Sequence, residues 1–169
     1  MKRFLIVGML GLTLVAPPHA VVAKKASSVR SPANRLTSPQ KAALAKSLRA
    51  LRRLSAATSA NLSASQYSER FIDAKVEVME NLANVPTGKS KTLTLKALNC
   101  YQDANDLWNA FLRNNGQDCE RILRKYFPDP NVFELDSDGN TTPRPALDEI
   151  WRIGAQRTEA AAASITQPQ

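Results

Sequence analysis

The stretch that most constrains the fold of this chain runs from Thr92 to Leu112, TLTLKALNCYQDANDLWNAFL. At 100° per residue its large and small apolar side chains fall on one helical face: Leu93, Ala97, Cys100, Ala104, Leu107 and Phe111, with Tyr101, Trp108 and Leu112 beside them. The opposite face is polar. Because so wide an apolar face must be buried, the segments before and after it must supply helices that pack against it.

Two such helices are predicted before the central one. Ser38-Pro39 is a typical helix start, and the helix over 39–60 has a narrow apolar stripe: Leu44, Leu48, Leu51, Leu54, Thr58 and Leu62. Ser63 or Ser65 caps a helix over 65–84, whose broad apolar face comprises Tyr67, Phe71, Ile72, Val76, Val78, Met79 and Leu82. The segment from Val85 to Gly88 ends it and leads into the central helix over 90–112.

Two more helices are predicted after the central one. Asp118 caps a short helix over 118–126, and Pro143 opens a last helix over 143–160 with Leu147, Ile150, Trp151, Gly154 and Thr158 on one face. No segment alternates as a strand would, and the chain holds only 6 glycines in 169 residues. We therefore predict an all-α fold, a small helical bundle of four to five helices over residues 38–160, followed by a disordered tail at 161–169.

The amino-terminal residues have the layout of a secretory signal peptide. Lys2 and Arg3 precede an apolar run of 13 residues, Phe4 to Ala16, which two prolines and small residues follow. The run is shorter than the roughly 20 residues that span a bilayer. We expect cleavage after Ala23, a flexible basic lead-in over 24–37, and export to the periplasm or the outside of the cell.

Export favours a disulfide between the only two cysteines, Cys100 and Cys119. The bridge spans only about 6 Å, yet a helix continued to Asn114 would carry the chain about 21 Å from Cys100. Five extended residues return at most about 17 Å. The disulfide therefore requires the helix to stop near Phe111 or Leu112; two free or intermolecular thiols are the alternative.

Basic charge is concentrated near the start of the chain. Residues 24–62 contain nine Lys or Arg and no acid, whereas residues 63–169 contain 12 basic and 15 acidic residues. Lys41, Lys46, Arg49, Arg52 and Arg53 lie on the first helix and are candidate polyanion-binding residues. No aromatic residue accompanies them to stack on a base, which argues against nucleic acid. An anionic membrane or wall polymer, or simple packing with a solvated charged face, remain as interpretations.

The second helix carries acids at helical spacing, Glu69, Asp73, Glu77 and Glu80, opposite its apolar face. They suit a solvated helix surface, a cation site, or a docking face for Lys46, Arg49 and Arg53 of the preceding helix. A second acidic segment, Glu134 to Gly139, has the first half of a calcium loop. Pro145 stands where that loop needs a glutamate, so an Asp-Gly turn is the simpler interpretation.

Catalytic motifs are missing. The only histidine, His19, lies within the expected signal peptide, which removes histidine-based nucleophile systems and metal sites from the mature chain. There is no glycine-rich phosphate loop, and Asp103 and Asp106 read as solvated helix surface. We expect neither enzymatic activity nor a cofactor.

The aromatic spacing carries one resemblance. Small exported helical proteins of unknown function from cyanobacteria have a similar pattern. In this chain it comprises Tyr67, Phe71 and Asp73-Ala74-Lys75, followed by Tyr101-Gln102-Asp103-Ala104 and Leu107-Trp108. The resemblance covers residues 65–113 and implies a two-helix core unit, with no functional residues.

Together these features predict an exported, non-enzymatic helical module that binds a protein partner, itself exported or in the cell envelope. The alternative is a surface binder of anionic polymer or lipid through the basic helix. Salt separates the two, since binding through exposed charge weakens as ionic strength rises.

Overall fold

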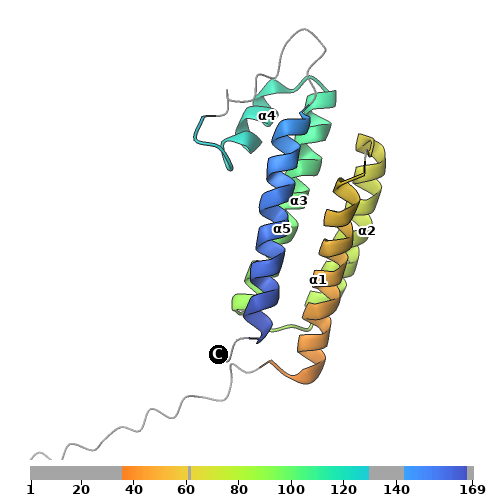
Figure 1. Ribbon diagram of the computed structural model, residues 1–169, viewed down its shortest axis with the longest axis vertical. Helices are drawn as coiled ribbons and strands as arrows, with labels where there is room; N and C mark the ends of the chain where they lie inside the picture. Colours follow the sequence, from red (N-terminus) through yellow and green to blue (C-terminus); the bar gives the residue numbers. More distant parts are fainter. Residues whose placement is uncertain (1–35, 61, 130–142, 167–169) are drawn as a thin grey trace, which may run out of the picture. The chain divides into compact units, whose positions relative to one another are not determined.

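The computed structural model describes residues 36–60, 62–129 and 143–166. These residues form five α-helices and no strand: α1 (Ser38–Thr58), α2 (Ala64–Leu82), α3 (Lys89–Leu112), α4 (Gly116–Leu123) and α5 (Arg144–Thr166) (Figure 1). The all-α prediction is confirmed. The expected signal peptide, the lead-in up to residue 35, and the segment from Glu134 to Gly139 lie outside the described residues.

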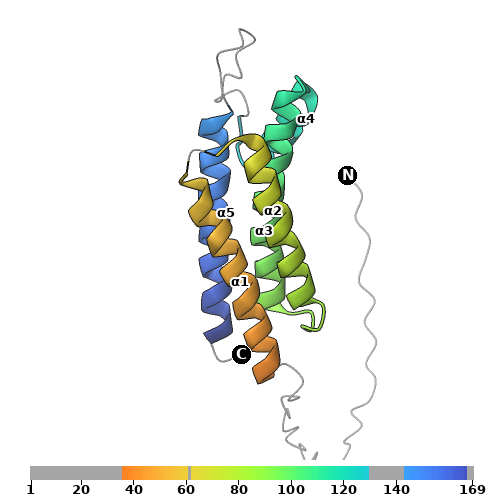
Figure 2. The same cartoon turned by 90° about the vertical axis from the view of Figure 1, so that its right-hand side faces the viewer.

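The four long helices form an antiparallel bundle in which each packs on the next. α1 contacts α2, α2 contacts α3, α3 contacts α5, and α5 returns to contact α1, closing the ring. Short α4 packs on α3 at one end of the bundle (Figure 2). Short connections favour antiparallel neighbours, which is why α1, α2 and α3 each lie beside the next long helix in the sequence. The buried face of every long helix therefore points into one shared core.

Side-chain caps fix the starts of the first two helices. Thr37 caps α1 through a reciprocal pair of hydrogen bonds with Gln40, and Ser63 caps α2 in the same way with Gln66. Each pair satisfies two backbone N–H groups that a helix terminus leaves open. Ser63 was one of the two caps predicted. The cap of α1 is Thr37 and not Ser38, because Thr37 has the glutamine three residues later that completes the motif.

The chain reverses between α3 and α4 at Asn114, whose φ of 52° lies in the left-handed region. The Asn115 N–H donates to the carbonyl of Ala110 at 2.9 Å and the Asn114 N–H to that of Phe111 at 3.0 Å, the hydrogen bonds of a Schellman motif. Asn115 then caps α4 by accepting from the Asp118 N–H at 3.2 Å. The prediction of Asp118 as the cap was wrong. Its carboxylate instead lies in the first turn, where the helix dipole favours it.

The predicted disulfide is also wrong: Cys100 and Cys119 are both buried free thiols and are not near each other. α3 does end at Leu112, as the bridge required, so the error lies in the return segment. That segment is helical from Gly116 and advances about 1.5 Å per residue instead of the extended 3.3 Å. Cys119 therefore stays near the far end of α3, while Cys100 lies three turns back along it.

Aromatic side chains and one glycine fill the centre of the bundle. Tyr67 packs between Trp151 and Trp108, with ring centroids 5.1 Å and 6.0 Å away. The ring of Tyr101 lies against Gly154 of α5, where an added Cβ would come within 3.1 Å of the ring carbon Cζ. The absence of a side chain at Gly154 lets α3 and α5 approach closely. The predicted inner face of α5 is fully buried: Leu147, Ile150, Trp151, Gly154 and Thr158.

The carboxyl-terminal helix is longer than predicted. The sequence placed its end near residue 160 and a disordered tail after it, but α5 continues to Thr166. Ala161 and Ser164 are buried against the start of α3, where the hydroxyl oxygens of Ser164 and Ser90 are 2.9 Å apart. Small residues allow this close helix contact. The buried hydroxyls have backbone partners as well, since Ser90 donates to the carbonyl of Ser164 and Ser164 lies within donating distance of the Ala161 carbonyl.

Candidate functional surface

The five basic residues singled out in the first helix do not form one continuous surface. All are exposed on α1, but Arg52 pairs with Glu159 of α5, and Arg53 pairs with Glu77 of α2. The remaining three, Lys41, Lys46 and Arg49, make no ion pair within the described residues. Two of the five candidates thus tie α1 to its two neighbours.

The pair between Arg52 and Glu159 is bidentate. Arg52 donates from Nε to Oε1 at 2.8 Å and from Nη2 to Oε2 at 2.7 Å. This hydrogen bonding raises the pKa of the arginine and lowers the pKa of the Glu159 carboxyl. Because both groups remain largely exposed to solvent, the pair contributes at most about 1 kcal/mol to stability. Its main effect is to fix the register of α1 on α5.

The acidic residues of α2 also divide into one that forms an ion pair with a neighbouring helix and others that do not. Glu77 accepts a hydrogen bond from Arg53, so the predicted docking of α1 on this acidic stripe is borne out for that pair. Glu69, Asp73 and Glu80 are exposed and make no ion pair within the described part of the chain. The same residues contain no group of three or more potential ligands that could hold a metal ion, so the cation-site interpretation has no structural support there.

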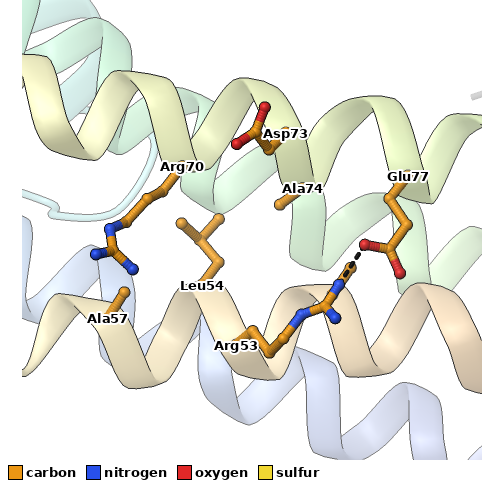
Figure 3. A pocket seen from close by; sticks show the side chains of 8 residues that line it. Arg53, Leu54, Ala57, Arg70, Asp73, Ala74 and Glu77 are labelled. Carbon is orange, nitrogen blue, oxygen red and sulfur yellow. Dashed lines mark hydrogen bonds and ion pairs between the residues drawn. The ribbon is translucent and has the colours of Figure 1, made fainter.

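A shallow groove of about 260 Å³ runs between α1 and α2 (Figure 3). Leu54, Ala57 and Ala74 form its apolar floor, and the pair between Arg53 and Glu77 closes one end. Arg70 reaches from α2 toward Ala57 of α1, whereas Asp73 points away from α1 (Figure 3). Asp73 is therefore presented to the outside of the bundle beside the groove.

The outward side of α2 carries large apolar residues in water. Ile72, Val76 and Met79 are 56%, 51% and 51% exposed. Their spacing of i, i+4 and i+7 places them on one ridge. The sequence assigned them to the buried face, which was wrong: Tyr67, Phe71, Ala74, Val78 and Leu82 make up that face. α2 packs mainly against α1 and α3, and its Tyr67 also reaches Trp151 of α5. Within the described residues, the side that carries Ile72, Val76 and Met79 stays exposed.

This ridge and the acids beside it form the candidate functional surface. We call it the α2 outer face and define it by its apolar ridge, Ile72, Val76 and Met79, and its exposed acids, Glu69, Asp73 and Glu80. Single exposed apolar side chains are ordinary, but a contiguous row of them marks an interaction site in many soluble proteins. Leu112, at the end of α3, is exposed by 61% and was also predicted to pack beside the central face.

Asp103 has a structural role that the sequence did not reveal. Its carboxylate accepts hydrogen bonds from the Tyr126 hydroxyl at 2.8 Å and from Lys125 Nζ at 2.6 Å. Only 15% of its side chain is exposed, so its interpretation as solvated surface was wrong. The contact ties the segment after α4 to the middle of α3. No motif signals it, because Asp103 and Tyr126 meet only after the chain reverses at Asn114.

Neither cysteine has the surroundings of a reactive thiol. Burial raises the pKa of Cys100 and of Cys119, which keeps both sulfurs protonated at neutral pH. Arg157 donates to the Cys100 sulfur at 3.1 Å and offsets part of this effect. Both are packed core residues.

A second groove, of about 270 Å³, lies between α1 and α5. Arg144 closes over it, with its guanidinium 5.1 Å from the ring centre of Trp151 and a hydrogen bond to the carbonyl of Thr58 at 3.1 Å. Asp148 and Glu149 neutralise Arg144 and Arg152. The charged groups around this groove are thus committed to internal contacts, and the α2 outer face is the better candidate.

Comparisons with known proteins bring no further assignment. No family model, no curated protein and no solved structure matches this chain. Among the helices that the structure describes, none combines the length and apolar character needed to cross a membrane.

Proposed function

We propose that this protein is an exported, non-enzymatic helical module that binds a protein partner through the α2 outer face. The observation that carries the proposal is the row of half-exposed apolar side chains, Ile72, Val76 and Met79, on a helix whose inner face is fully packed. Leaving such a row in water costs burial energy that a partner would recover. Export rests on the signal-peptide pattern of residues 1–23, which places the partner in the periplasm or outside the cell.

The test uses a photo-crosslinking amino acid in place of Val76, incorporated in the native host. Ultraviolet irradiation of cells should join the mature chain to one partner, identified by mass spectrometry. Its recovery should fall when Ile72 and Met79 are changed to serine. Leu112→Ser is the matched control, because it removes an equally exposed apolar side chain from the end of α3.

The binding of anionic polymer or lipid through α1 is the competing proposal, supported by the exposed charges of Lys41, Lys46 and Arg49, which make no ion pair within the described ranges. Replacing Lys46 and Arg49 with glutamine separates the two. If those changes abolish localisation or crosslinking while Ile72→Ser/Met79→Ser leaves them intact, α1 is the functional surface and the α2 proposal is wrong. Enzymatic activity is not part of either proposal.

A further inference from the structure

The charges around the apolar ridge restrict what can cover it. Glu69, Asp73 and Glu80 lie along one side of the ridge, and none is paired within the described residues. The basic residue on the other side, Lys75, is turned toward α3. Its Nζ donates to Gln102 at 2.7 Å and lies 5.7 Å from the ring centre of Phe71. The α2 outer face therefore presents apolar anchors with a net negative border.

A negative border excludes several classes of partner on electrostatic grounds. An anionic membrane, a wall polymer and a nucleic acid would each bring like charge against Glu69, Asp73 and Glu80. A second copy docking by the same face would oppose three acids with three acids. The charge pattern instead complements a positively charged partner that also has apolar side chains to bury.

The shape of the surface selects a helix. Ile72, Val76 and Met79 form a straight ridge on a regular helix, and such a ridge packs into the side-chain grooves of another helix. From Glu69 to Glu80 the surface is about 16 Å long, at 1.5 Å rise per residue, which is three helical turns. A partner helix of that length would place apolar anchors at i, i+4 and i+7 over the ridge and basic residues over its acidic border.

Resting on the proposed function, we infer that the α2 outer face docks a basic amphipathic helix of a partner protein, with Ile72, Val76 and Met79 contacting its apolar stripe and Glu69, Asp73 and Glu80 pairing with its Lys or Arg.

The probe for this inference is a fluorescein-labelled helical peptide of four turns with Leu at i, i+4, i+7 and i+11 and Lys on both flanks. Two sister peptides have Glu in place of every Lys, or Ser in place of every Leu. Fluorescence anisotropy with the full mature chain should show saturable binding of the first peptide only. Because the pairing involves exposed charges, its affinity should fall as salt rises.

Matched variants locate the binding. Ile72→Ser/Val76→Ser/Met79→Ser should weaken it by roughly tenfold or more, since three apolar contacts are lost. Glu69→Gln/Glu80→Gln should weaken it several-fold and flatten its salt dependence. Glu120→Gln/Asp148→Asn makes the same change in net charge at exposed acids elsewhere and should leave the affinity within about twofold. Circular dichroism confirms that each variant is folded.

Three results would overturn the inference: equal binding of the Glu peptide, an equal effect of the control pair, or self-association of the protein alone that Ile72→Ser/Val76→Ser/Met79→Ser abolishes. The last would make a second copy the occupant. The crosslinking experiment at Val76 stands apart. If a partner is captured but the peptide does not bind, the proposed function stands and the basic helix is rejected. If the peptide binds but no partner is captured, the α2 outer face can dock a basic helix and the proposed function is rejected.

Discussion

Tyr101 is held in the core by a contact that leaves no room for change. Its ring carbons Cζ and Cε2 would lie 3.1 Å and 3.2 Å from a Cβ built on Gly154, and its own side chain is fully buried. Its hydroxyl is also buried and has no hydrogen-bond partner within the described residues. An interior at crystal-like density has no free volume into which such a ring could retreat.

Gly154→Val should therefore lower the free energy of unfolding by about 2 kcal/mol or more, because the added carbons overpack the contact between α3 and α5. Urea unfolding followed by circular dichroism measures the change. Gly116→Val is the control, since nothing lies within 4 Å of a Cβ at that position. Equal stability of the two variants would mean that α3 and α5 are not packed as described.

At the same scale, the sequence predicts burial better than it predicts polar contacts. Tyr67, Tyr101 and Trp151 stood out as apolar positions at helical spacing, and all three are buried. The hydrogen bond between Asp103 and Tyr126 could not be predicted from the sequence, because the two residues are 23 positions apart and meet only once α4 is placed. The pairing of Cys100 with Cys119 failed for a related reason: it rested on the compartment, and the local path of the chain decided the outcome.

Among the elements, α5 shows how alanine-rich segments mislead. The residues after Ala160 have Ile165 as their one large apolar side chain and resemble a fraying end, yet small side chains are what a close helix contact requires. Ala161 is fully buried and Ser164 nearly so, both against α3. Helical periodicity continues through this segment even though its hydrophobicity is low.

Ala161→Asp should destabilise the protein by about 3 kcal/mol or more, because it places an unpaired charge in a buried helix contact. Ala160→Asp introduces the same side chain one residue earlier, at an exposed position, and should change stability by no more than about 0.5 kcal/mol. Thermal unfolding of both variants beside the parent chain tests this. If the two aspartates are tolerated alike, the helix ends before residue 161.

α2 shows the opposite limit of sequence reasoning. Its apolar residues cover more than half of the helix circumference, and periodicity alone assigned the whole arc to the core. In this bundle α2 packs mainly against α1 and α3, so the arc of α2 that is buried is narrower than the arc that is apolar. The surplus, Ile72, Val76 and Met79, could be recognised as a surface only after the neighbours of α2 were placed.

For the whole molecule, the tyrosine hydroxyls and cysteine thiols with raised pKa values predict how stability changes at high pH. Burial raises the pKa values of Tyr67, Tyr101, Cys100 and Cys119, and burial together with the Asp103 carboxylate raises that of Tyr126. In the unfolded chain these groups ionise at their ordinary values, about 8.5 for cysteine and about 10 for tyrosine. Their contribution to stability is complete below those values and is lost as pH rises above them.

The free energy of unfolding should therefore fall above about pH 9, by as much as about 1.4 kcal/mol per pH unit for each group that is ionised only in the unfolded chain. Urea titrations between pH 7 and pH 11 measure the slope. Tyr126→Phe removes one such group and should make the fall shallower above pH 10, although it also loses the hydrogen bond to Asp103 at every pH. A flat profile to pH 11 would contradict the burial of these side chains.

The contact that closes the ring, between α1 and α5, also sets the order in which the fold can be completed. α1 and α2 pair through neighbouring sequence, but the helix that covers the other side of α1 ends at Thr166, about 100 residues after α1 ends. At a synthesis rate of roughly 5–20 residues per second, the α1–α2 hairpin is complete roughly 4–17 seconds before α5 is. During that interval the residues of α1 that pack on α5 lack this partner, so the nascent chain exposes apolar side chains that the finished fold buries.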